Sequence, residues 1–205
     1  MKSMVLLSCV AMIGGTALAA YGQKQMLITS GVSVLHGGYA IARETGQVIA
    51  YGDTNVMAYD QSSVTAYDNS TVEAHDNSVV HGYAKSQISA SDSARAYVAN
   101  HATVKAEGTA HIEAANEATV IAHGSATVVG SKDCEIKAYD NTTVFASGNS
   151  KVEAHGDASI SAHGDTVVTA TDNVSVEAFD NVQVTCTKSC KIILHDTAKK
   201  VIVSG

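Results

Sequence analysis

Histidine and aspartate are the side chains of this chain that could bind a metal ion or transfer protons. The sequence contains nine His, and five of them occupy one equivalent position of a short repeat: His75, His123, His155, His163 and His195. A metal site needs three or four converging ligands, and the coil geometry favoured below stacks no two of these five directly. Many Asp residues lie at turns, but the Gly-Gly-x-Gly-x-Asp loops of calcium-binding repeat proteins do not occur. We therefore expect no metal and no cofactor.

The sequence contains no recognisable catalytic motif. No Ser-His-Asp order, paired-carboxylate motif or phosphate-binding loop stands out from the repeat. Repeat proteins that are enzymes usually carry their active sites on long loops, and this unbroken repeat leaves no insertion that could form a cleft. The sequence therefore predicts a protein that is not an enzyme.

Three cysteines fall on repeat positions that are predicted to face inward: Cys134, Cys186 and Cys190. One interpretation is that they are small, buried and unreactive thiols. The other is a disulfide between Cys186 and Cys190, which flank one turn and could be joined if the protein is exported.

The composition requires an interior built from small side chains. Of the 205 residues, 45% are apolar and 16% are charged, which excludes a disordered chain. There is no Pro or Trp, and there are only two Phe but 16 Gly, so a core based on large side chains is also excluded. The formal net charge of −7 argues against a nucleic-acid partner, because such a partner requires a basic face.

An eight-residue repeat runs through most of the chain and predicts short β-strands. Val or Ile recurs at every eighth position from Val48 to Ile192, except at Ala96. A column of small residues precedes it by two positions and a column of Ala follows it by two, so all three point to one side of a strand. The remaining positions are rich in Asp, Asn and Gly, which suit sharp turns. At Ala96 the columns exchange, with Val98 in the Ala column, and this keeps the core volume.

Short strands joined by turns of constant length predict a chain that coils, with equivalent strands stacked in parallel. The predicted fold is all-β, a parallel β-solenoid or β-helix, and right-handed coiling is favoured by analogy with crossover connections. Sorting the outward residues that follow the Val column at a period of three octads gives one largely apolar class and one polar class. We therefore favour a three-sided coil of 24 residues, with a two-sided coil of 16 residues as the alternative.

The first residues differ from the repeat and predict an export signal. Residues 1–19 combine Lys2, a short apolar run and an Ala17-Leu18-Ala19 ending, as in a cleaved signal peptide, and a hydrophobic anchor is the alternative. Residues 20–47 are assigned to an N-terminal cap or first irregular coil, and residues 48–205 to the octad-repeat solenoid. The mature chain is expected to have no stable membrane span and to be extracellular or at the cell surface. If the leader is retained, a virion or cytoplasmic location is the alternative.

The octad Ser-x-Val-x-Ala-Tyr-Asp-Asn, as at residues 62–69, resembles a family of octapeptide-repeat (V-x-A-Y-D-N-S-x) β-solenoid proteins of bacteria and phages, mostly uncharacterised. The resemblance covers about residues 46–198 and implies the solenoid fold, but it implies no activity. The octads are more distantly similar to those of ice-nucleation proteins. A continuous Thr-x-Thr row is absent, so we expect no role in ice binding.

These features predict a non-enzymatic structural protein, exported or virion-associated: a rod, fibre or matrix subunit that self-associates laterally or end to end. Lateral packing would use an apolar outward row of the 24-residue coil, and the apolar and basic last octads would form the end contact. The alternative is an adhesin or a receptor- or carbohydrate-binding fibre module, whose aromatic face would bind glycans or a cell-surface partner. The predicted assembly face is Ile49, Tyr97, Ile121, Phe145 and Ile193, and the predicted ligand face is Tyr51, Tyr59, Tyr67 and Tyr83.

Overall fold

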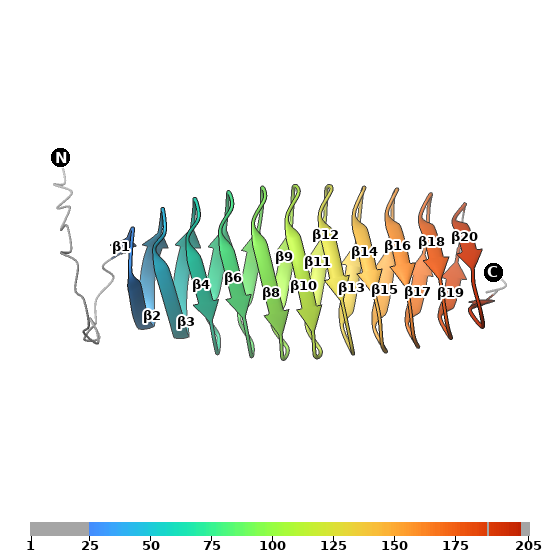
Figure 1. Ribbon diagram of the computed structural model, residues 1–205, viewed down its shortest axis with the longest axis horizontal. Coiled ribbons are helices and arrows are strands. Elements are labelled where there is room, and N and C mark those ends of the chain that lie inside the picture. The colour runs from blue at the N-terminus through green and yellow to red at the C-terminus, as the bar shows by residue number, and fades with distance from the viewer. Residues whose placement is uncertain (1–24, 188, 202–205) are drawn as a thin grey trace.

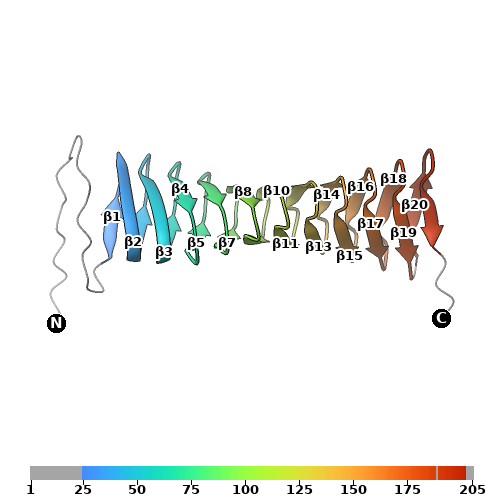
Figure 2. The same ribbon diagram turned by 90° about the horizontal axis from the view of Figure 1, so that it is seen from below.

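The protein is a β-solenoid in which the chain winds in coils about one long axis (Figure 1). The computed structural model describes residues 25–187 and 189–201, so the predicted leader 1–19 and the start of the predicted cap lie outside the described residues. About 11 turns stack along the axis, and the described residues form 21 strands in one parallel sheet with no helix. The predicted all-β parallel β-solenoid is confirmed, and Figure 2 shows the same stack of coils from a second side.

Each coil contributes one strand to each of two opposite faces, which we call face A and face B. The first coils contain β1 (Met26–Ile28), β2 (Val32–Ala42) and β3 (Gln47–Ala58), and both β2 and β3 run through the two faces. Face A continues with β4 (Ser63–Ala66), β6 (Val79–Gly82), β8 (Arg95–Ala99), β10 (His111–Ala115), β12 (Thr127–Gly130), β14 (Thr143–Ala146), β16 (Ser159–Ala162), β18 (Ser175–Ala178) and β20 (Lys191–Leu194). Face B continues with β5 (Thr71–Ala74), β7 (Gln87–Ala90), β9 (Thr103–Ala106), β11 (Thr119–Ala122), β13 (Glu135–Ala138), β15 (Lys151–Ala154), β17 (Val167–Ala170), β19 (Gln183–Cys186) and β21 (Lys199–Val201).

The strand register shows that one coil contains two octads, so the predicted three-sided coil of 24 residues is wrong. Ile112 of β10 lies beside Val128 of β12, and Val120 of β11 lies beside Ile136 of β13. From β3 onward paired residues are 16 positions apart, which is the two-sided alternative. Two facing sheets about 10 Å apart leave an interior that Val and Ala side chains can fill.

The interior consists of the three inward columns of each face. The Val and Ala columns are buried almost without exception, as Val64, Val72 and Ala66 illustrate. The exchanged pair Ala96 and Val98 is buried as well. Residues of the neighbouring coils compensate for the changed sizes of these two side chains. The longer Ile112 lies beside Ala96, and Gly82 lies beside Val98. Core volume is therefore conserved between coils as well as within one strand.

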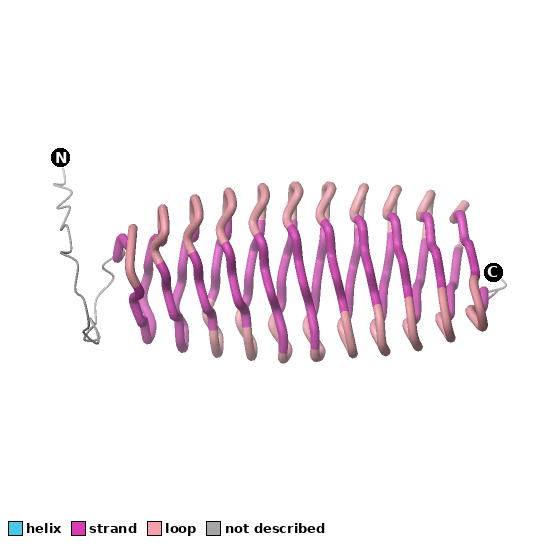
Figure 3. The backbone as a smooth tube through the Cα atoms, viewed as in Figure 1, coloured by secondary structure: helices cyan, strands magenta, loops and turns pink. Residues whose placement is uncertain are grey.

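The turns between strands lie along two opposite edges of the rod, as Figure 3 shows. We call the turn after each face A strand corner 1 and the turn after each face B strand corner 2. At most corners one residue adopts the left-handed conformation, for example Asp68 and Asp76, both with φ of 57°. Asp, Asn and Gly tolerate this conformation best, which explains their abundance at this octad position.

Candidate functional site

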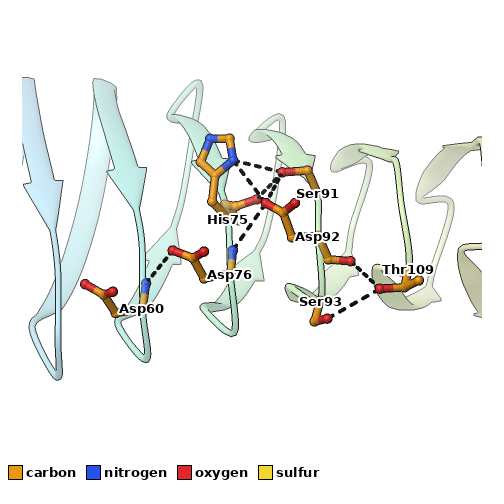
Figure 4. A network of polar contacts seen from close by, with 8 residues as sticks. Asp60, His75, Asp76, Ser91, Asp92, Ser93 and Thr109 are labelled. Atoms are coloured by element: carbon orange, nitrogen blue, oxygen red, sulfur yellow. Dashed lines mark hydrogen bonds and ion pairs between the residues drawn. The ribbon is translucent and has the colours of Figure 1, made fainter.

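Aspartate and asparagine side chains at the corners link each coil to the coil before it. The carboxylate of Asp76 accepts a hydrogen bond from the backbone N–H of Asp60 at 3.1 Å (Figure 4). Asn149 donates from Nδ2 to Oδ1 of Asp133, also one coil earlier, at 3.2 Å. The corner acids therefore satisfy backbone and side-chain donors of neighbouring coils, which explains their repetition without a bound cation.

Aromatic rings at the corners stack on one another along the axis. Tyr51 and Tyr67 have ring centroids 4.9 Å apart and planes 7° apart, and Tyr67 and Tyr83 continue the stack at 5.3 Å. Tyr59 lies on the opposite edge, where its ring stacks on that of His75 at 5.0 Å. Further stacks are His123–Tyr139–His155 on corner 2 and His163–Phe179–His195 on corner 1.

The structure therefore divides the predicted ligand face between two corners. Tyr51, Tyr67 and Tyr83 lie together on corner 1, and Tyr59 lies apart from them on corner 2. Within a stack each ring covers the face of its neighbour. A sugar that stacks on an aromatic face could therefore reach only the last ring of a stack.

The predicted assembly face is divided as well. Ile49, Tyr97, Phe145 and Ile193 share one outward column of face A, but the 16-residue register places successive members three coils apart. Ile121 lies in β11 on face B. The five residues therefore form no continuous apolar row.

One polar network on corner 2 brings together a serine, a histidine and an aspartate (Figure 4). His75 Nδ1 lies 2.8 Å from Ser91 Oγ and 3.7 Å from Asp92 Oδ2, and the Ser91 hydroxyl also donates to Asp92 at 3.2 Å. In a Ser-His-Asp triad the serine and the aspartate contact opposite nitrogens of the imidazole. Here both contact Nδ1, so the geometry matches a link between two coils rather than an activated nucleophile. This network could not be recognised in the sequence, because His75 and Ser91 are separated by a full coil.

A second network surrounds His155 and does use both ring nitrogens. Nδ1 lies 2.8 Å from Thr171 Oγ1, and Nε2 lies 3.1 Å from Glu153 Oε1. The hydrogen bond from His155, supported by Lys137, holds the pKa of the Glu153 carboxyl below its ordinary value. The Thr171 hydroxyl also donates to Asp172 at 3.1 Å. Both ring nitrogens of His155 are therefore occupied by neighbouring side chains, one from the same strand end and one from the next coil.

The three cysteines separate into one disulfide and one thiol. Cys186 at the end of β19 and Cys190 just before β20 form a disulfide with a Cα–Cα distance of 6.2 Å. Cys134 is buried, and its Sγ donates to the carbonyl oxygen of Ser131. Burial raises the pKa of the Cys134 thiol, which keeps the group protonated and weakly nucleophilic.

Among the described residues, no three His, Cys, Asp or Glu side chains converge as a metal site requires. In the same part of the chain, no helix has the length and hydrophobicity needed to cross a membrane. Searches against protein-family models, curated proteins and solved structures found no match to this chain. The functional inferences therefore depend on the geometry of the solenoid itself.

Proposed function

We propose that the protein is a non-enzymatic structural rod whose copies associate end to end. The observation that supports this proposal is the position of the exposed large apolar side chains. Among the described residues there are nine, of which four lie in β1 and β2, two in β20 and three between them. Those near the ends are Leu27, Val32, Val34, Tyr39, Ile193 and Leu194.

The strand edges favour the same contact. Within the described part of the chain, β20 pairs with β18 alone, so its outer edge has no strand partner there. Such an edge is a template for pairing with another chain. Ile193 belongs to the outward column of face A that begins with Val34, because Val34 pairs with Ile49. Extending this column by one coil sets Ile193, 44% exposed, beside Val34 of the next copy, 39% exposed.

The disulfide supports a proposal of export. Disulfides persist in oxidising compartments and are uncommon in reducing ones. The Cys186–Cys190 bond lies at the start of the last described coils, close to the proposed contact. We therefore propose that the rod assembles outside the reducing cytoplasm.

The test compares a charged substitution at the end of the rod with a matched one in its middle. Light scattering of the purified protein over a concentration series, with electron microscopy, should show linear assemblies for the wild type. Ile193→Lys should shift the mass to that of the monomer, and Phe145→Lys, in the same outward column, should leave assembly unchanged. A wild-type protein that is monomeric at every concentration would refute the proposal. Loss of assembly in Phe145→Lys alone would show lateral packing instead.

A further inference from the structure

The aromatic series of corner 1 stops after Tyr83. The position held by Tyr51, Tyr67 and Tyr83 is occupied in the next four coils by small residues, of which Ala99 and Ala115 come first and two serines follow. The turns that follow these alanines each contain two consecutive left-handed residues, Asn100–His101 and Asn116–Glu117, with φ between 53° and 70°. The exchange of Ala96 and Val98 lies in the same strand as Ala99, β8. Irregularities of sequence and backbone therefore coincide at one place on the rod.

Two aromatic stacks end at this interruption. The corner stack ends at Tyr83, because the Ala99 methyl of the next coil is too small to cover a ring. On face A, His81 stacks on Tyr97 at 4.9 Å, and the next residue in that column is Glu113. The break leaves a hollow of about 240 Å³. It is lined by Tyr83, Tyr97, Val98, Ala99, Glu113, Ala114, Ala115, Val129 and Ser131.

The charge and polarity of the hollow indicate which ligand fits it. Glu113 is the one charged residue of the lining, and the rest consists of two tyrosines, five small or aliphatic residues and Ser131. The contact described for the Glu113 carboxylate is with His111, whose Nε2 lies 3.6 Å away and is charged only when protonated. Aromatic faces attract cations, and a cation that carries methyl groups also packs against apolar surface.

We propose that this hollow binds an alkylated ammonium group, such as a quaternary ammonium. Glu113 would supply the opposite charge, Tyr83 and Tyr97 the aromatic contact, and Ala99 and Ala115 apolar contact. The volume lies below the range of about 300–1,000 Å³ for drug-sized ligands, so it suits a small headgroup or side-chain terminus. The net charge of −7 favours cations in general, and this hollow combines a carboxylate with two rings that end their stacks. The proposal does not rest on end-to-end assembly.

An NMR titration of the intact protein with tetramethylammonium chloride at constant ionic strength tests the proposal. We expect saturable shifts of the Ala99 and Ala115 amides, and no such shifts with tert-butanol, a neutral molecule of similar shape, or with glucose. Glu113→Gln and Tyr83→Ala should each weaken binding by about two- to fivefold, as expected for an exposed cation–π or charge contact. Glu177→Gln, in the same outward column but outside the hollow, should leave the affinity unchanged.

Three results would overturn the proposal: no saturable shift, equal binding of tert-butanol, or unchanged affinity in Glu113→Gln. Saturable binding of glucose alone would assign the hollow to a saccharide instead. If tetramethylammonium binds as expected, the same spectra recorded with phosphatidylcholine vesicles and with a trimethyl-lysine peptide distinguish a lipid headgroup from a modified protein as the source of the ammonium.

Discussion

A methyl group added at Gly130, in the Ala column, would collide with the Ile136 side chain in its present conformation. A Cβ atom added to Gly130 would lie 2.3 Å from Cδ1 of Ile136, closer than real Cβ contacts. Gly82 and Ile88 repeat this relation, with a distance of 2.4 Å. Most other octads place Ala and Val at the two positions, and Ala154 with Ile160 shows that Ala and a buried Ile also fit when the isoleucine is placed differently. We therefore predict that Gly130→Ala destabilises the protein, because the fully buried Ile136 must leave its present position to make room for the methyl group.

The magnitude follows from two opposing effects. Overpacking of a core costs about 1–3 kcal/mol. Replacing Gly by Ala in a compatible strand stabilises a protein by about 0.4–1 kcal/mol, because it lowers the conformational entropy of the unfolded chain. The net expected loss in the free energy of unfolding is about 1 kcal/mol. Ile136→Val alone should cost about 0.5–1.5 kcal/mol. In the Ile136→Val background the clash is gone, so Gly130→Ala should become neutral or stabilising there.

Urea unfolding followed by far-UV circular dichroism measures all four proteins of this cycle. The coupling energy between the two substitutions should be at least about 1 kcal/mol and favourable. Ile160→Val, in a strand two coils farther along face A, serves as the control and should be additive with Gly130→Ala. If Gly130→Ala had the same cost in the wild type and in the Ile136→Val background, the explanation from packing would be refuted.

Two further predictions concern the inward serines and the ionisation of Glu153. Ser78 and Ser150 are both fully buried, but the Ser78 hydroxyl has no hydrogen-bond partner whereas that of Ser150 donates to Ser147 O at 2.7 Å. Ser78→Ala should therefore raise the free energy of unfolding by about 1 kcal/mol and Ser150→Ala should lower it by a similar amount; equal effects in urea unfolding would contradict this. The pKa of Glu153 is lowered in the folded state, first by the hydrogen bond from His155, so its contribution is complete above the ordinary Glu pKa and is lost as the pH falls through the lowered value. Glu153→Gln should consequently lower the urea midpoint at pH 7 but not at pH 3, and an equal loss at both values would disprove the linkage.

The local features of the solenoid could be predicted because each depends on residues close in sequence. The two-residue spacing of small residues, Val and Ala decides which side chains of a strand face inward, and Val64 and Ala66 are buried accordingly. The turns at Asp68 and Asp76 follow from the tolerance of Asp for the left-handed conformation. Even the exchange of Ala96 and Val98 was readable, because core volume must be conserved.

The number of octads in a coil was decided by which strands pair in the tertiary structure. The inward columns are nearly the same in every octad, so they fit a two-sided and a three-sided coil equally well as a pattern. The register of adjacent coils, in which paired residues are 16 positions apart, shows that one coil holds two octads. The sequence did contain one indication of the coil length, the 16-residue spacing of Tyr51, Tyr67 and Tyr83, because these rings stack in adjacent coils.

The number of residues in one coil determines which side chains meet on every surface of the rod. It places Ile121 and Phe145 on different faces, and it brings His75 next to Ser91 and Asp92. The hollow beside Glu113 likewise arises where one coil ends an aromatic stack and the next carries Ala99 at the same position. The sequence by itself determined the strand, its inward side and its turns, since these are local. The tertiary structure decided which side chains are neighbours, since that depends on how far the chain travels before it returns to the same face.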